Sequence, residues 1–154
     1  MTVATLPFAA RLVIGHLLAT EAVTDLAGGN IGTDNPRTPE PDRGIVRVTQ
    51  FPGRIISGGT IYWLESTPLQ VDCWGPGGSD RLASYDLAEE CRRALWSLAG
   101  EVEFTIGNST VAGVVTGVDV GGIRPDNDEA FEPAKPYAHF DAVLTAHPQP
   151  NTGS

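Results

Sequence analysis

Lysine is nearly absent from this sequence, and basic residues as a whole are scarce. Lys135 is the only lysine, and 10 Lys and Arg residues stand against 19 Asp and Glu residues, which gives a formal net charge of −9. Proteins that bind nucleic acid use clustered Lys and Arg side chains, which displace counterions from the phosphates. The charge balance therefore excludes a surface specialised for holding a phosphate backbone.

Long apolar runs are missing as well. The longest apolar stretch near the start, Leu12 to Ala19, is interrupted by Gly15 and His16. It is far shorter than the ~20 residues that a membrane-spanning helix needs. It also lacks the basic segment and the small-residue cleavage site of a signal peptide. We therefore expect no membrane contact and no export signal.

Cysteine is rare, with Cys73 and Cys91 the only two. They do not form a CxxC pair, and a metal site built on them would need further ligands that the sequence does not evidently supply. In a chain without an export signal, two reduced and buried thiols are expected rather than a disulfide.

The residues that are abundant indicate a globular chain with many loops. Of the 154 residues 41% are hydrophobic, while 18 Gly and 12 Pro mark frequent turns. This length suits one domain with a core of its own. We expect a single domain over residues 1–148 and a flexible tail over 149–154.

Hydrophobic spacing in the first half predicts helix followed by strands. Two helical pieces are expected between Leu6 and Gly28, with Thr20 capping the second and Gly28 ending it. A proline-rich loop over 34–43 follows, and strands are expected over 45–51, 60–65 and 68–74. The segment Pro52 to Gly59 between the first two strands is predicted to be a long, mobile hairpin arm.

The second half begins with the clearest helix, expected from Ser79 or Asp80 to about Leu98. A hairpin turning at Gly107 and Asn108, a long loop over 121–136 and a last strand over 138–146 should follow. Strands in consecutive runs favour an α+β fold. We expect a mostly antiparallel sheet of about five or six strands, with an N-terminal helix pair and one long helix packed on it.

Residues that could perform chemistry are few. His139 and Asp141 share one face of the last strand, with Asp119 on a possible neighbour, and could in principle bind a metal; the simpler interpretation is a polar sheet face. The acidic stretch 126–129 lacks the glycine and the spaced glutamate of a calcium loop. The glycine pairs lack phosphate-binding motifs. We expect no catalytic, metal or cofactor site, and a small oligomeric hydrolase using His139 and Asp141 remains an alternative.

Aromatic residues and loops indicate assembly instead. Trp63 and Trp74 lie in adjacent predicted strands and Trp96 lies on the long helix, and tryptophan is enriched at interaction hot spots. Each of them could equally belong to the core. Two long arms without a catalytic constellation suit a subunit that joins other subunits.

The chain from Phe8 to Pro148 resembles the tail terminator proteins of long-tailed bacteriophages, also called tail completion or minor tail proteins. The resemblance lies in an ordered series of segments: Ala27–Ile31, Ile45–Val48, Leu69–Gly75, Ala88–Leu95, Gly113–Gly122 and Lys135–His147. It implies a small subunit that forms a ring, typically six-fold, on the head-proximal end of the tail tube. There it would stop tube polymerisation and present a surface to the head-side connector or stopper protein.

The resemblance further implies a virion protein of the neck region, assembled in the host cytoplasm, with no catalytic residue. DNA would pass through the bore without specific binding, and an acidic lining would repel its phosphates. Ring closure requires a patch that meets a different patch on the neighbour. The residues expected at interfaces lie in the arm, in the loop over 121–136 and at two tryptophans: Arg54, Ile55, Ile56, Trp63, Trp74, Arg124 and Phe131.

Two alternatives to a tail terminator stay open. Another neck protein, such as a head–tail adaptor or a stopper, would bind the head side rather than cap the tube. A generic oligomeric binding domain outside any virus is the third possibility.

Overall fold

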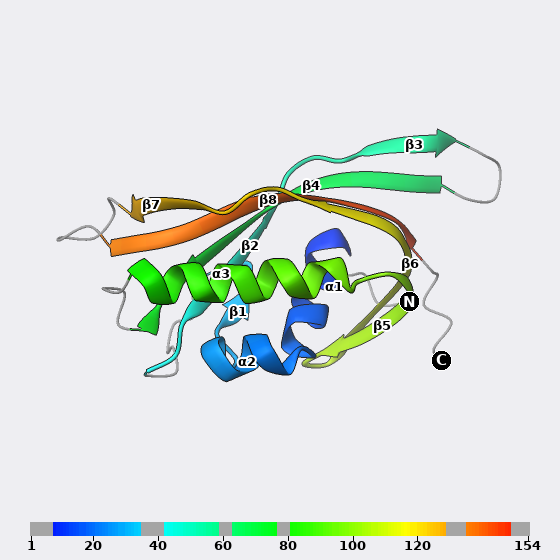
Figure 1. Cartoon of the computed structure of the whole chain (residues 1–154). Helices are drawn as coiled ribbons and strands as arrows, with labels where there is room; N and C mark the ends of the chain where they lie inside the picture. Colours follow the sequence, from blue (N-terminus) through cyan, green and yellow to red (C-terminus); the bar gives the residue numbers. More distant parts are fainter. Residues whose placement is uncertain (1–7, 35–41, 59–62, 77–80, 129–134, 149–154) are drawn as a thin grey trace.

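The structure is a computed structural model that describes residues 8–34, 42–58, 63–76, 81–128 and 135–148 (Figure 1). These parts of the chain contain three helices, α1 (Phe8–Leu18), α2 (Glu21–Ala27) and α3 (Arg81–Trp96). They also contain eight strands: β1 (Ile31–Gly32), β2 (Ile45–Gln50), β3 (Arg54–Gly58), β4 (Trp63–Trp74), β5 (Gly100–Ile106), β6 (Ser109–Val120), β7 (Arg124–Asp128) and β8 (Lys135–Pro148).

All eight strands belong to one sheet. Its continuous path runs β1-β2-β4-β8-β6-β5, while β3 extends the sheet along β4 and β7 extends it along β8. Every pair is antiparallel except β1 with β2. The predicted α+β fold with a mostly antiparallel sheet is confirmed, with six strands on the main path and two more that pair with its inner strands β4 and β8.

The three helices lie on the same side of the sheet, and none of the described helices lies on the opposite face (Figure 1). α3 runs along β4 and β8, and the sheet curls so that the β5–β6 hairpin lies beside α1. We call the uncovered side the helix-free face. It is available for functional side chains because the core is built entirely on the other side.

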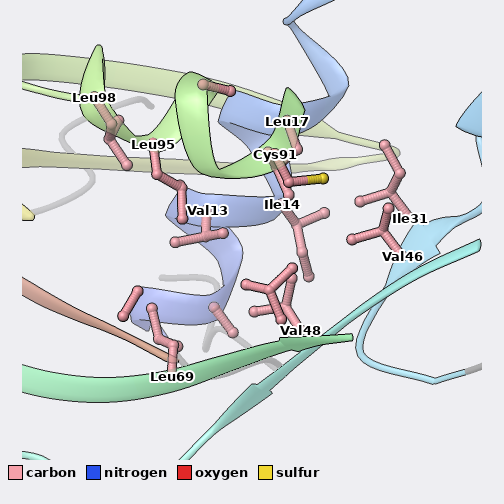
Figure 2. Packing of buried hydrophobic residues seen from close by; sticks show 14 of the residues in the cluster. Val13, Ile14, Leu17, Ile31, Val46, Val48, Leu69, Cys91, Leu95 and Leu98 are labelled. Atoms are coloured by element: carbon pink, nitrogen blue, oxygen red, sulfur yellow. The ribbon is translucent and has the colours of Figure 1, made fainter. Parts of the chain in front are cut away.

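The core is centred on α1, which is buried almost all round. Figure 2 shows Val13, Ile14 and Leu17 of this helix lying between α3 and the strands. The surrounding elements contribute Val46 and Val48 of β2, Leu69 of β4, and Cys91 and Leu95 of α3 to the same cluster. The predicted apolar stripe of α3 and the apolar face of the last strand both point into this core, as expected.

The central strand β4 corrects one prediction. Two separate strands were expected over 60–65 and 68–74, but Trp63–Trp74 is a single strand that contains Pro68. The Pro68 carbonyl accepts the Phe51 N–H at 2.9 Å, so its ring nitrogen faces the point where the chain leaves β2 and passes to β3. A proline is tolerated there because no N–H is needed where the neighbouring strand is interrupted.

The segment 121–136 corrects a second prediction. It was expected to be a loop, but Arg124–Asp128 forms β7 and pairs with the start of β8. β6 and β7 follow the same edge of β8, separated by Gly121 and Gly122, and the Gly121 N–H donates to the Asp141 carbonyl at 2.8 Å. The glycines therefore separate two strands that pair with the same edge of β8, and residues 129–134 of the predicted loop lie outside the described residues.

Both cysteine thiols are free and fully buried, as predicted, and their Sγ atoms lie 4.0 Å apart across the β4–α3 contact. Burial raises the pKa of Cys73 well above its ordinary value of 9.0, and the neighbouring Cys91 thiol adds to this effect. The Cys73 thiol is therefore not poised for chemistry, and Cys91 is equally buried.

The helix boundaries largely agree with prediction. Thr20 is the N-cap residue of α2, although its Oγ1 donates to the His16 carbonyl at 2.7 Å instead of capping, and Gly28 ends the helix with a φ of 56°. The expected caps Ser79 and Asp80 of α3 lie outside the described residues, as does the predicted tail 149–154. None of the described helices is long and apolar enough to span a membrane.

Candidate interaction surfaces

The first candidate surface is a hairpin that projects from one end of the sheet. We call it the arm: the connection 51–53, β3, and the start of β4 that pairs with β3 (63–66). Figure 1 shows it extending away from the helices. Three of its apolar side chains are exposed, Phe51 to 43%, Ile55 to 61% and Ile56 to 46%, and Arg54 is exposed beside them. The predicted arm residues Arg54, Ile55 and Ile56 thus lie together at the surface.

Local sequence explains how the arm is built. A Cβ on Gly53 would lie 2.7 Å from Thr67 Oγ1 and 2.8 Å from the Ser66 carbonyl oxygen, so only glycine allows the chain to pass this close to β4. The ladder shifts register between Ile55 and Ser57, which leaves Ile56 as an extra residue opposite β4. The outer edge of β3 has no paired strand among the described elements, so the arm offers both apolar side chains and an open edge.

Trp74 does not have the exposure expected of an interface residue. It is only 4% exposed because its ring stacks on Tyr137 at 5.3 Å and the Arg47 guanidinium lies over it at 4.9 Å. The β2–β4 and β4–β8 registers place these neighbours beside it. Trp63 begins β4, but its side chain lies outside the described residues, and so does Phe131.

The helix-free face carries a row of ionisable residues that crosses four strands. Arg47 of β2 is opposite Asp72 of β4, Asp72 is opposite His139 of β8, and His139 is opposite Arg124 of β7. Arg47 Nη2 lies 3.0 Å from Asp72 Oδ2, and Gln70 Nε2 donates to Asp72 Oδ1 at 2.7 Å. Asp72 is 1% exposed, so this row includes a buried carboxylate that is satisfied by its neighbours.

Arg124 is exposed but held in place on this face. Its Nη2 donates to Asp141 Oδ2 at 2.8 Å and lies 3.5 Å from His139 Nδ1, while His139 Nε2 is 3.8 Å from Asp126 Oδ2. Tyr137 stacks on His139 at 5.3 Å, and burial together with the Asp126 charge raises the pKa of Tyr137 from 10.0. The structure brings Arg124, His139 and Asp141 together at the opposite end of the sheet from the arm.

The same cluster bears on the hydrolase alternative. His139 and Asp141 do share one face of β8, as expected, but the cation beside Asp141 is Arg124. Asp119 is opposite Val143 rather than His139. In the part of the chain that the structure describes, no three His, Cys, Asp or Glu side chains form a group that could hold a metal ion.

Acidic residues gather on the helix-free face. Val102 and Phe104 of β5 pack toward the core, so the exposed Glu101 and Glu103 that alternate with them point to the other side. The same side carries four more carboxylates and four basic residues: Asp119, Asp126, Asp128, Asp141, Arg47, Arg54, Arg124 and Lys135. Even with Asp72 left aside as the partner of Arg47, this face has more acids than bases.

A further surface runs along the solvent side of α3. Leu82 is 68% exposed, Tyr85 43% and Trp96 56%, and their spacing places them on the side opposite the buried stripe. The Arg92 guanidinium lies over the Trp96 ring at 4.7 Å. We call Leu82, Tyr85 and Trp96, with Asp86 and Glu89 that share this side, the α3 stripe. The sequence points to Trp96 along with the other tryptophans, but it predicts neither Leu82 nor Tyr85 at an interface, although helical spacing from the buried positions places all three on this side.

No protein-family model matches this chain, and the comparison with curated proteins finds no match either.

Proposed function

We propose that this protein is a tail terminator: a subunit that forms a ring on the head-proximal end of a bacteriophage tail tube, stops polymerisation of the tube protein and provides the surface for joining the head connector. The resemblance of the chain to that family motivates the proposal. The observation that carries it is the arm, which exposes Ile55 and Ile56 beyond the body of the domain. Exposed apolar side chains on a projecting hairpin are typical of subunit contacts.

Ring formation is supported by the unlike ends of the subunit. The arm, which is apolar with one arginine, projects at one end of the sheet, and the polar β7–β8 hairpin with Arg124 lies at the other. A subunit whose arm has no like counterpart at its other end must contact a different patch on its neighbour, and such head-to-tail contacts close into a ring when the rotation between neighbours permits. A six-fold ring is the number that the family resemblance implies.

The helix-free face suits the wall of a DNA channel. Its acids outnumber its basic residues, and negative charge repels phosphates, so DNA would pass without sticking. We propose that this face lines the bore and that the protein acts as a structural virion component in the neck, without turnover and without a cofactor.

The proposal is tested by binding to isolated virion parts. Purified protein should bind one end of tail tubes taken from cells that lack its gene, and should make those tails able to join DNA-filled heads. Binding measured by electron microscopy of labelled protein at tube ends supports the terminator function. Binding to isolated heads, with none at tube ends, would show a stopper or adaptor instead, and binding to neither would reject a role in the neck.

A further inference from the structure

The α3 stripe exposes three large apolar side chains, and no element in the described part of the chain covers them. The stripe extends over about 21 Å of helix from Leu82 to Trp96, at 1.5 Å per residue. The side chains of Leu82, Tyr85 and Trp96 are all exposed. Single exposed apolar residues need no explanation, but three on one side of a helix can contribute to a contact surface. The described elements of the chain leave this side of α3 open (Figure 1).

Four of the six charged residues of α3 pair with one another. Arg92 lies 3.7 Å from Glu89, and Arg93 lies 3.9 Å from Glu89 and 3.3 Å from Glu90. Asp86, exposed between Tyr85 and Glu89, has no ion pair with any described residue. The stripe therefore combines three large apolar side chains with an acid that lacks a cation.

The arm combines exposed apolar side chains with a basic residue instead of an acidic one. Ile55 and Ile56 supply exposed apolar surface, and Arg54 next to them has no ion pair with any described residue. Among the described strands of one chain β3 pairs only with β4, and Figure 1 shows the arm pointing away from α3. The arm cannot reach the stripe of its own chain, so a match between the two requires a second molecule.

We propose that the α3 stripe is the docking site for the arm of a second copy of this chain, with Ile55 and Ile56 packed among Leu82, Tyr85 and Trp96 and with Arg54 paired to Asp86. Each copy then gives one arm and receives one. This contact deepens the proposed function, because it supplies the head-to-tail interface of the ring, but the contact itself depends only on the two surfaces.

The apolar part is tested by sedimentation velocity on two variants and their mixture. Ile55→Asp with Ile56→Asp removes the arm surface, and Leu82→Glu with Trp96→Glu removes the stripe. Each variant alone should be monomeric under conditions where the unaltered protein self-associates. Their equimolar mixture should form dimers and nothing larger, because one intact arm and one intact stripe remain. Leu26→Asp, an exposed apolar position on α2 (38%), is the control that should leave assembly unchanged.

The ionic part is tested by charge exchange. Arg54→Asp and Asp86→Arg should each weaken self-association, by about fivefold or more in the dissociation constant, since an exposed ion pair is replaced by repulsion. The double variant should regain most of the affinity. Thermal unfolding monitored alongside separates loss of contact from loss of fold.

Three results would overturn the inference. These are an unaltered protein that is monomeric at its highest soluble concentration, a mixture of the two apolar variants that stays monomeric, and a charge-exchanged double variant no better than the singles. The two proposals fail separately. Protein that assembles through the arm and stripe but does not bind tube ends refutes the tail function alone, whereas tube-end binding that survives both apolar variants refutes the docking contact alone.

Discussion

Arg47 lies against two buried partners at once: its Nη2 is 3.0 Å from the Asp72 carboxylate, and its guanidinium carbon is 4.9 Å above the ring of Trp74. The Arg47 side chain is about one-third exposed, while Asp72 is nearly fully buried. A single surface arginine therefore covers both a carboxylate and an indole on the helix-free face. This arrangement shields two groups that would otherwise meet solvent on an uncovered sheet.

Replacing Arg47 should destabilise the fold strongly. Arg47→Ala leaves the Asp72 carboxylate without its cation, and the loss of one partner of a buried pair costs about 3 kcal/mol. Urea unfolding measures the change. Arg93→Ala is the matched control, because Arg93 pairs only with exposed-side glutamates of its own helix and should cost less than about 1 kcal/mol. Equal losses for both variants would contradict the role given to Arg47.

Two glycines of β6 should respond oppositely to alanine. A Cβ on Gly113 would lie 2.7 Å from the Phe8 ring and 3.1 Å from the His147 carbonyl oxygen, whereas a Cβ on Gly117 would meet nothing within 4 Å. Gly113→Ala should therefore lose about 1–3 kcal/mol by overpacking. Gly117→Ala should be neutral or gain up to about 1 kcal/mol, because glycine is unfavourable inside a strand. The midpoints of denaturant unfolding compare the two variants, provided that the dependence of the unfolding free energy on denaturant is the same. A Gly113→Ala variant as stable as the unaltered protein would show that α1 does not pack on β6 this closely.

Alkaline pH should weaken the fold through Tyr137. The phenol is neutral when protonated, and burial with the Asp126 charge raises its pKa in the folded state above 10.0. The folded chain thus holds this proton more tightly than the unfolded chain. The resulting stability is fully present below the unfolded pKa and is lost as pH rises through the folded pKa. With Tyr137→Phe, the free energy of unfolding measured in urea should fall less steeply as the pH becomes alkaline. An unchanged decline would assign it to other groups.

The two thiols should be inert in the folded protein. Cys73 and Cys91 are 0% exposed, and burial raises the pKa of Cys73, so a thiol reagent should react only when the chain opens. Reaction rates should rise in step with the unfolded fraction as urea is added. Cys91→Ser, which leaves Cys73 as the single thiol, separates the two sites. Fast labelling of native protein would show that the β4–α3 contact is open in solution.

Periodicity predicted the parts of the fold in which one face is buried. The apolar stripe of α3 and the alternation along β8 identified both elements and their inward faces, because each packs against a single layer. The exposed arm was equally predictable, since its glycine and proline bracket a short apolar run. These features depend on neighbours in the sequence alone.

Features that depend on strand register were not predictable. Trp74 is buried by Arg47 and Tyr137, which lie 27 residues before it and 63 residues after it, so nothing near Trp74 indicates that it is covered. Pro68 suggested a break between two strands. The proline is tolerated within β4 because it lies where β2 ends and β3 begins, and that position follows from the register of the sheet. β7, with the sequence Arg-Pro-Asp-Asn-Asp, has low strand propensity and forms because β8 offers an edge.

Tail length is the measurement that tests the proposed function most directly. Particles made without this protein should be imaged by electron microscopy, and the length of every tail should be compared with that of complete particles. A terminator that stops tube growth predicts overlong or unjoined tails, and their correction when the unaltered gene is restored. Tails of normal length beside heads that leak DNA would contradict the account and assign the protein to the head side of the neck.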